Sequence, residues 1–389
     1  MRDAVIVEAV RTPFGRRNGK LKDVHPVLLG SLVLKELVGR AGIEPGAVED
    51  VVWGCVGQVG EQSANLGRNT WLAAGFPVET PATTVDRQCG SSQQALHFAA
   101  NLIQSGVADV TIAGGAESMS RVPIGINMTQ GPGVPFPPEL MELYEMVPQG
   151  ISAELMARKY GVTRREMDEF SVESHRRAAE ATEKGYLRSQ LLPVTVPAPE
   201  NGGQDVLDRD EGIRPNSTYE AVAALQPAFD PEHSITAGNS SQITDGAAAV
   251  LLMSAEKAHE LGVKPRARIA AQKVVGTDPV LMLEGPIPGT RAVLEGAGLE
   301  LKDIDLFEIN EAFASVVLSW QKETGADLAK TNVNGGAIAI GHPLGASGAR
   351  LVCHLLHELE RRDARYGLQA MCCGGGIGTA TIIERGNGH

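Results

Sequence analysis

The chain has 389 residues, of which 43% are hydrophobic and 21% charged, and its 47 acidic against 35 basic residues give a formal net charge of −12. This composition is typical of a folded protein of about two or three domains and excludes a mostly disordered chain. The negative charge opposes long-range attraction to nucleic acid or an anionic membrane, so we expect neither as a partner.

The first residues, 1–19, alternate like a strand and lack the apolar block and cleavage site of a signal peptide. No stretch reaches the ~18 consecutive apolar residues that a membrane helix needs. The cysteines are sparse and odd in number, which favours reduced thiols over a disulfide framework. We therefore expect a cytoplasmic protein with free thiols, which are Cys55, Cys89, Cys353, Cys372 and Cys373.

A strand, a helix and a second strand follow one another in the first part of the chain. Residues 48–58 predict a buried strand, residues 88–103 a small-residue turn that begins an apolar-periodic helix, and residues 107–118 a strand that ends near glycines. This order is typical of βαβ units and predicts mainly parallel strand pairing.

A segment of different character comes next. Residues 130–140 are rich in Pro and Gly, residues 151–181 form a helical run, and residues 199–217 form a polar loop. We interpret this segment as an inserted loop domain that lies over the rest of the fold and covers its candidate site. The first half resumes within residues 241–258, where a buried strand leads into a helix.

The last part of the chain repeats the order of the first. Residues 301–314, 341–359 and 366–384 predict a strand, a helix behind a glycine-rich turn, and strand segments around a glycine run. We interpret the repetition as duplication of an α/β unit. The resulting division is an N-terminal half over residues 1–118, the inserted loop domain over 119–245, the end of the N-terminal half over 246–268, and a C-terminal half over 269–389.

Cys89 is the first candidate for chemistry. It lies between a β-branched strand and the predicted helix, with Gly90 and two serines beside it. The N–H groups and the positive dipole end of a helix N-terminus favour a thiolate, so we expect an activated nucleophile here. The alternative is a small buried thiol, which is the usual fate of a cysteine.

Three further candidates lie in glycine-rich turns or at strand ends. His342 lies in the glycine-rich stretch 332–348, Cys372 precedes three glycines, and Asn310 follows a buried strand. Polar groups at the carboxyl ends of parallel strands are expected where such sheets bind ligands. A structural role for a loop histidine and a helix cap for Asn310 remain the alternatives.

Two other patterns are weak. The glycines of residues 374–378 suggest a dinucleotide fingerprint, but a strand follows them where that motif needs a helix. Cys353, His354 and His357 share one face of a predicted helix, as metal ligands can, but no second ligand cluster accompanies them. We expect no metal and no bound cofactor.

Two thiols, an imidazole and a carboxamide together suit acyl transfer between thioesters. A thiolate can form a covalent acyl intermediate while an imidazole takes its proton. A second thiol can exchange a proton with a carbon acid, and backbone N–H groups can stabilise the oxyanions. Carbon–carbon bond chemistry between thioesters uses a second thiol, whereas aldehyde and ester chemistry need none.

With these residues in view, the sequence resembles the thiolase family over essentially its whole length. The motifs are DRQCGSSQQA at residues 86–95, NEAFA at 310–314, GGAIAIGHPLGASG at 335–348 and CCGGGIG at 372–378. The resemblance implies an α/β, thiolase-like fold in which two duplicated βαβ-type halves pack as a five-layer αβαβα sandwich.

The resemblance also implies roles for the candidate residues. Cys89 would accept the acyl group and His342 would activate it. Asn310 would position a water that forms one oxyanion hole with His342, and the N–H groups of Cys89 and Gly374 would form the other.

The tandem cysteines and one loop need separate comparison with the family. In its C-x-G-G-G-x-G motif one residue separates the cysteine from the glycines, so Cys372 matches the acid/base and the role of Cys373 stays open. Many short-chain biosynthetic thiolases carry His-Met-Gly in the covering loop, whereas this chain has Val147-Pro148-Gln149-Gly150. The shape of the acyl pocket is therefore not carried over.

Coenzyme A would be a substrate and not a bound cofactor. Arg214 and Ser241 match positions that contact coenzyme A, and an arginine suits an anionic ligand of an acidic protein. Ordinary core packing is the alternative for the aromatic and methionine side chains among the remaining positions. The residues that would line the pantetheine channel are Phe229, Met282, Ala312 and Phe313.

The implied activity is reversible thiolysis of a 3-oxoacyl-CoA to acetyl-CoA and a shortened acyl-CoA. The DRQCGSSQQA and GPIPGTR stretches resemble degradative thiolases of actinobacteria that act on fatty acids or steroids. The alternatives are a short-chain biosynthetic acetoacetyl-CoA thiolase, a ketoacyl synthase, and a non-catalytic acyl-CoA carrier or complex subunit. A homodimer or homotetramer is expected, with a hydratase–dehydrogenase as a further candidate partner.

Overall fold

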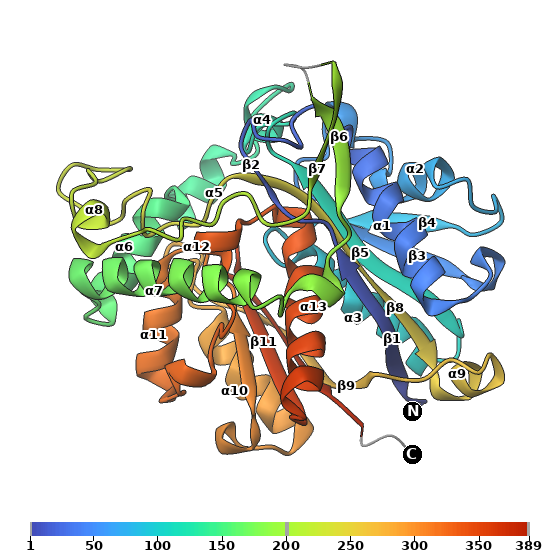
Figure 1. Cartoon of the computed structure of the whole chain (residues 1–389). Helices are drawn as coiled ribbons and strands as arrows, with labels where there is room; N and C mark the ends of the chain where they lie inside the picture. Colours follow the sequence, from blue (N-terminus) through green and yellow to red (C-terminus); the bar gives the residue numbers. More distant parts are fainter. Residues whose placement is uncertain (1, 199–201, 387–389) are drawn as a thin grey trace.

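The computed structural model describes residues 2–198 and 202–386. Its main feature is a ten-stranded sheet of order β10-β11-β12-β9-β1-β8-β5-β3-β4, with β2 paired to β8 (Figure 1). The strands of this sheet are β1 (Ala4–Arg11), β2 (Gly15–Arg16), β3 (Asp50–Gly54), β4 (Ala82–Val85), β5 (Val110–Ser118), β8 (Thr244–Ser254), β9 (Ala267–Gly276), β10 (Leu306–Ile309), β11 (Tyr366–Cys373) and β12 (Ile377–Glu384).

Helices pack against this sheet and lie between its two parts, of which one contains β1–β5 and β8 and the other β9–β12. They are α1 (Pro26–Ala41), α2 (Leu66–Ala73), α3 (Ser91–Gln104), α4 (Ile126–Thr129), α5 (Pro138–Leu143), α6 (Gln149–Lys159), α7 (Arg164–Glu183), α8 (Tyr219–Ala223), α9 (Ala255–Glu260), α10 (Pro286–Ala297), α11 (Ala314–Thr324), α12 (Ala337–Ile340) and α13 (Leu344–Arg362). Among the described residues, no helix is both long and apolar enough to cross a bilayer.

The strand–helix–strand order predicted for each half is present, as β3, α3 and β5 and again as β10, α13 and β11. Among the described strands, the two parts of the sheet meet where β1 pairs with β9, at Val5↔Arg268 and Ile6↔Ala267. The fold class is therefore confirmed, with the two halves joined into one continuous sheet.

The prediction of mainly parallel pairing is wrong. Parallel pairs are confined to β3 with β4, β3 with β5, and β10 with β11. β8 runs antiparallel to both neighbours, and β12 returns directly from β11 as a hairpin. The turn of that hairpin contains Gly375 and Gly376 at φ 81° and 75°, a backbone conformation that glycine adopts without steric cost. The antiparallel direction of β8 and β12 cannot be predicted from the order of strands and helices alone, because it depends on which strand each of them pairs with in the folded protein.

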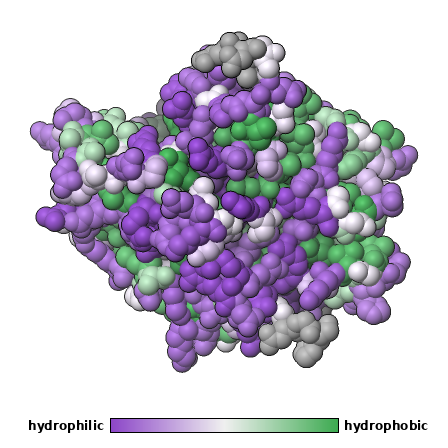
Figure 2. Space-filling view, in the orientation of Figure 1, coloured by the Kyte–Doolittle hydropathy of each residue, from purple (hydrophilic) through white to green (hydrophobic). Residues whose placement is uncertain are grey.

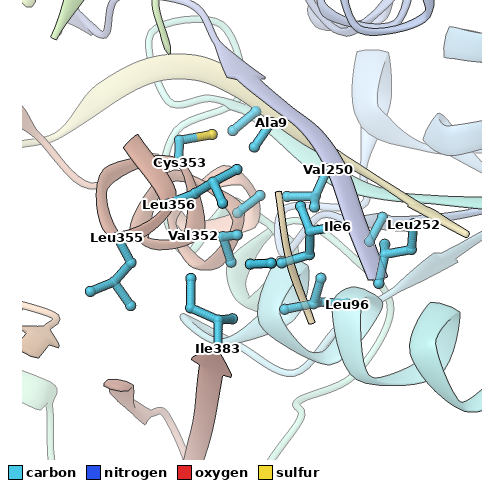
Figure 3. Close-up of a cluster of buried hydrophobic side chains, with 14 of the residues drawn as sticks. Ile6, Ala9, Leu96, Val250, Leu252, Val352, Cys353, Leu355, Leu356 and Ile383 are labelled. Carbon is cyan, nitrogen blue, oxygen red and sulfur yellow. The ribbon is translucent and has the colours of Figure 1, made fainter. Parts of the chain in front are cut away.

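Three apolar clusters separate five layers of structure. The inner cluster contains side chains of both sheet parts together with α3 and α13, which pack on each other between them. Figure 3 shows Leu96 of α3, Val352 of α13, Val250 of β8 and Ile383 of β12 meeting in this cluster. The outer clusters hold α1 and α2 against one part of the sheet, and α10 and α11 against the other. The order of layers is thus helix, sheet, helix, sheet, helix.

The segment between β5 and β8 contacts both halves. Helices α6 and α7 pack on α11 and α12, and they gather with α8 at the left of Figure 1. The hairpin of β6 (Val194–Ala198) and β7 (Gly203–Leu207) instead adds Val194, Val196 and Leu207 to the cluster around α1. The face shown in Figure 2 is largely hydrophilic, in keeping with the net negative charge.

Candidate active site

A tight turn presents Cys89 at the start of α3. Gln88 has φ 49°, and its N–H donates to Asp86 Oδ1 at 2.7 Å. Ser91 Oγ accepts from Arg87 N–H at 2.9 Å and donates to the Gln88 carbonyl at 2.6 Å. These short-range bonds hold the residue before the nucleophile in a left-handed conformation that only a fixed turn maintains.

The Cys89 thiol is buried, and burial sets its pKa. Burial raises the pKa of this thiol to about 11, although the Gly374 N–H, its own N–H and the Gln149 side chain lower it. The prediction of a resting thiolate is therefore wrong: the energy of removing the charge from water exceeds what the N–H groups return. Cys89 is a neutral thiol at pH 7 and needs a base.

His342 is the residue predicted to act as that base. Its Nδ1 lies 2.6 Å from Ser347 Oγ, and that hydroxyl donates to the Pro343 carbonyl at 2.8 Å. Because the Ser347 proton is already used, Ser347 Oγ accepts the Nδ1–H, and Nε2 keeps a free lone pair. Burial and, to a lesser degree, the charge of Arg350 lower the pKa of His342 to about 3, so the imidazole is neutral.

Asn310 reaches His342 from the end of β10. Its N–H donates to the Ala370 carbonyl at 3.1 Å, which ties it to β11, and its Nδ2 lies 3.3 Å from His342 Nε2. Its Oδ1 is buried and has no hydrogen-bond partner within residues 2–198 and 202–386. A buried carbonyl oxygen of this kind is where a bound water or substrate group would donate a hydrogen bond. The helix-cap alternative does not hold, because Phe313 is the residue that precedes α11.

The two tandem cysteines face opposite sides of β11, as successive strand residues do. Cys372 lies in the cluster that contains Met282, Ala312 and Phe313. Its pKa is raised well above its usual value by burial, and then by the neighbouring thiols of Cys89 and Cys373. Cys372 is therefore on the side of β11 that faces the residues predicted to line the pantetheine channel. It is also close enough to Cys89 for a charge on that sulfur to raise the pKa of Cys372.

Cys373 has a different environment. Burial raises the pKa of its thiol, and the neighbouring Cys89 raises it further. A Cβ on Gly90 would lie 2.7 Å from this sulfur, so Cys373 fills the space directly beneath the nucleophile turn. This explains why the turn needs a glycine after Cys89.

Two buried carboxylates, those of Glu117 and Glu311, hold the loops of the site. Glu117, at the end of β5, accepts from Val56 N–H, Gly57 N–H and Gly345 N–H, each at 2.9 Å, and from Gln62 Nε2 at 2.7 Å. One carboxylate thus connects the N-terminal half to the turn that follows His342.

Glu311 does the same for the turn that precedes His342. It accepts from Ser174 Oγ at 2.7 Å, Asn332 Nδ2 at 3.0 Å and Ile338 N–H at 3.1 Å. A Cβ on Gly336 would lie 2.3 Å from its carboxyl carbon. The signal that could have found both residues is an acid at the end of an otherwise apolar strand, which must be paired when buried.

Five of the six predicted coenzyme A residues lie near one another. The Ser241 N–H donates to the Ala312 carbonyl at 2.9 Å. Met282, Ala312 and Phe313 share the cluster that contains Cys372. Phe229 is 47% exposed and its ring centroid lies 6.3 Å from that of Phe313, in an edge-on arrangement.

Arg214, the sixth, is exposed, and its N–H donates to His175 Nδ1 at 3.1 Å. In the described part of the chain it makes no hydrogen bond or ion pair with the other five residues. The Arg214 side chain therefore faces solvent, on the segment between β5 and β8.

The Cys353, His354 and His357 pattern lies inside the protein. All three side chains are buried on α13, and His357 Nε2 lies 3.1 Å from the Ala9 carbonyl oxygen. The described residues contain no group of three His, Cys, Asp or Glu arranged to hold a metal ion. These side chains pack and hydrogen-bond within the core.

Comparisons with known proteins agree over the full length of the chain. Residues 4–256 match the family model "Thiolase, N-terminal domain", and residues 263–385 match "Thiolase, C-terminal domain". The chain is 49% identical over 393 residues to the steroid 3-ketoacyl-CoA thiolase FadA6 of Mycobacterium tuberculosis, covering 99% of this chain and 95% of that protein.

Two further relatives extend this similarity. The 3-ketoacyl-CoA thiolase of Bacillus subtilis is 44% identical over 392 residues, covering 99% of this chain and 100% of that protein. The solved structure of the Bacillus anthracis acetyl-CoA acetyltransferase superimposes with a TM-score of 0.91 at 42% identity, covering 99% of each chain.

Proposed function

The chain belongs to the thiolase family and is an acyltransferase, and from that premise we propose that it is a degradative 3-ketoacyl-CoA thiolase that works through a Cys89 acyl-enzyme. Free coenzyme A cleaves a 3-oxoacyl-CoA into acetyl-CoA and a shorter acyl-CoA that lacks the carbons released as acetyl-CoA. The observation that carries the assignment of Cys89 is its buried place just before α3, where it packs with Cys373 of β11 and with Leu344, the first residue of α13.

The first half-reaction forms the acyl-enzyme. His342 Nε2 takes the Cys89 proton and the thiolate attacks the C3 ketone carbon. The N–H groups of Cys89 and Gly374 stabilise the alkoxide. When this intermediate collapses, the C2–C3 bond breaks and its electron pair passes to the acetyl-CoA enolate. The Cys372 thiol then protonates C2, and acetyl-CoA leaves.

Asn310 supports this step at the second oxygen. The enolate oxygen would face His342 Nε2, which now carries the proton, and a water held by the unpaired Asn310 Oδ1. This arrangement places one pair of donors at each oxygen that becomes negative. The two oxyanions form at different steps, so the site needs two separate sets of donors.

The second half-reaction releases the product. The Cys372 thiolate takes the proton of coenzyme A, whose sulfur attacks the acyl thioester. Cys89 leaves as a thiolate and recovers its proton from His342, so both cysteines and the imidazole return to their initial state. The facing of Cys372 toward the channel cluster supports its role here, because Cys373 is enclosed beneath Gly90.

We also propose that the coenzyme A site is built from the covering segment and the end of β10. Arg214 would attract the phosphates, and Ser241 would contact the thioester arm. The exposed ring of Phe229 and the buried Met282, Ala312 and Phe313 would line the pantetheine channel. We further propose a homodimer or homotetramer, which light scattering on the purified protein would test.

Thiolysis assays across 3-oxoacyl-CoA substrates from four carbons to long-chain and steroid-like acyl groups, with Cys89→Ala beside the wild type, test the proposal. The 49% identity to a steroid thiolase favours activity that rises with acyl bulk. Activity confined to acetoacetyl-CoA would instead support the short-chain alternative, which the similarity to an acetyl-CoA acetyltransferase favours. Thiolysis that survives in Cys89→Ala, or thiolysis of no substrate, would contradict the proposed function.

A further inference from the structure

Gln149 brings a side-chain carboxamide from the segment between β5 and β8 to the turn that contains Gly374. It is the first residue of α6, where the sequence Val147-Pro148-Gln149-Gly150 departs from the His-Met-Gly of many short-chain thiolases. The ideal Cβ position of Gly374 lies 3.4 Å from Gln149 Nε2. The Gln149 side chain is also one of the groups that lower the pKa of the Cys89 thiol. A carboxamide therefore stands beside the N–H groups of Cys89 and Gly374.

Contacts fix the backbone at the start of α6, and so they fix the position from which the Gln149 side chain extends. Ser152 Oγ donates to the Val280 carbonyl at 2.6 Å, which ties α6 to the loop before Met282. A Cβ on Gly150 would lie 2.2 Å from the Phe229 ring, so that ring packs directly on the helix start. Only the side-chain torsions of Gln149 remain free.

The neighbouring Gln88 does not duplicate this donor. Its Oε1, an acceptor, is the atom nearest to the ideal Cβ position of Gly374, at 3.0 Å. Its Nε2 points to the Asp86 carboxylate, at 3.3 Å from either oxygen. Of the two glutamines, Gln149 is thus the one that presents N–H groups to the sulfur.

We propose that the Gln149 carboxamide is a third hydrogen-bond donor to the Cys89 sulfur and that it stabilises the thiolate when His342 takes the proton. This inference rests on the proposed function, in which Cys89 is the nucleophile. The two main-chain donors come from α3 and from the β11–β12 turn, whereas Gln149 comes from the covering segment. The segment between β5 and β8 therefore completes the donor set around the nucleophile.

The test is the pH dependence of Cys89 alkylation by iodoacetamide in the free enzyme, followed by mass spectrometry of the Cys89 peptide. Gln149→Met keeps the length of the side chain and removes the donor, so the apparent pKa rises by about one unit and alkylation at a fixed pH below it slows about tenfold. Gln149→Glu keeps the shape and adds a negative charge, so the pKa rises further than in Gln149→Met.

Gln130→Met is the matched control, because Gln130 is an exposed residue of the same segment; its alkylation profile should equal that of the wild type. Unchanged profiles in both Gln149 variants would overturn the proposal, even if turnover slows, because that result assigns Gln149 a packing role only. The same holds if Gln149→Glu behaves like the wild type while Gln149→Met does not, since shape would then be decisive. The profile needs no turnover, so failure of the proposed function shows separately, as thiolysis that persists in Cys89→Ala.

Discussion

His342 Nε2 lies 3.3 Å from Asn310 Nδ2, although the first belongs to the turn before α13 and the second to the end of β10. Because an amide nitrogen can only donate, the Nε2 lone pair accepts this hydrogen bond, and the Asn310 Oδ1 stays buried and unpaired within the described residues. The joining of β10 to β11 fixes the position of Asn310, since its N–H donates to the Ala370 carbonyl.

The tautomer of His342 depends on Ser347. Ser347→Ala removes the acceptor of Nδ1–H, so the ring loses the bond that keeps Nε2 basic, and kcat for thiolysis should fall about ten- to a hundredfold with little change in KM. The measurement is steady-state thiolysis. Ser319→Ala is the control, because Ser319 is also a buried helical serine and its Oγ has no partner in the described structure. Equal loss in both variants would show that Ser347 acts only through stability.

The tandem cysteines should separate by function. Cys372→Ala removes the group that we expect to move a proton to and from carbon, and thiolysis should fall by at least about a hundredfold. Cys373→Ala should keep kcat within about threefold and cost about 1–2 kcal/mol of unfolding free energy, because its sulfur packs beneath Gly90. Thiolysis rates and urea unfolding of the two variants decide the matter. The reverse pattern would assign the acid/base role to Cys373.

Glu117 should be a determinant of stability as well as of site geometry. Glu117→Gln cannot accept all four of the hydrogen bonds that the carboxylate receives, and one amide N–H group would face other donors. We expect a loss of about 2–4 kcal/mol in the free energy of unfolding. Urea denaturation measures it. A change below about 0.5 kcal/mol would mean that the link between Val56 and Gly345 carries no net energy.

Buried histidines should make the protein acid-sensitive. Burial lowers the pKa of His97 and of His342 to about 3, and that of His175 to about 4. The unfolded chain, with an ordinary histidine pKa near 6.5, therefore binds more protons than the folded chain below that pH. The contribution of these groups is fully present above pH 6.5 and is lost as the pH falls toward their folded values.

Urea unfolding at several pH values measures this effect. His97→Gln should reduce the slope of unfolding free energy against pH between about pH 6 and 4 by about 1.4 kcal/mol per pH unit. The glutamine can keep a hydrogen bond to Thr381, which His97 Nε2 contacts at 2.8 Å. An unchanged slope in the variant would show that His97 does not stay neutral in the folded protein.

The local features of this protein can be predicted from its sequence alone. The repeated strand–helix–strand order, the turn that places Cys89 at the start of α3, and the glycine-rich turns around His342 and Cys372 follow from short-range preferences. The family resemblance assembled these residues into one predicted site, and Asn310 and His342 do meet as it implied.

Features that depend on distant partners and on burial could not be predicted from the sequence and are seen only in the folded structure. The antiparallel strands β8 and β12 overturned the prediction of mainly parallel pairing, because pairing direction is chosen between segments far apart in the chain. Burial also overturned the expected thiolate, because the local turn around Cys89 contains no information about how much water the fold excludes. The contact of Glu117 with Gly345 and the approach of Gln149 to Gly374 bring together residues that are far apart in sequence, and no local pattern predicts them.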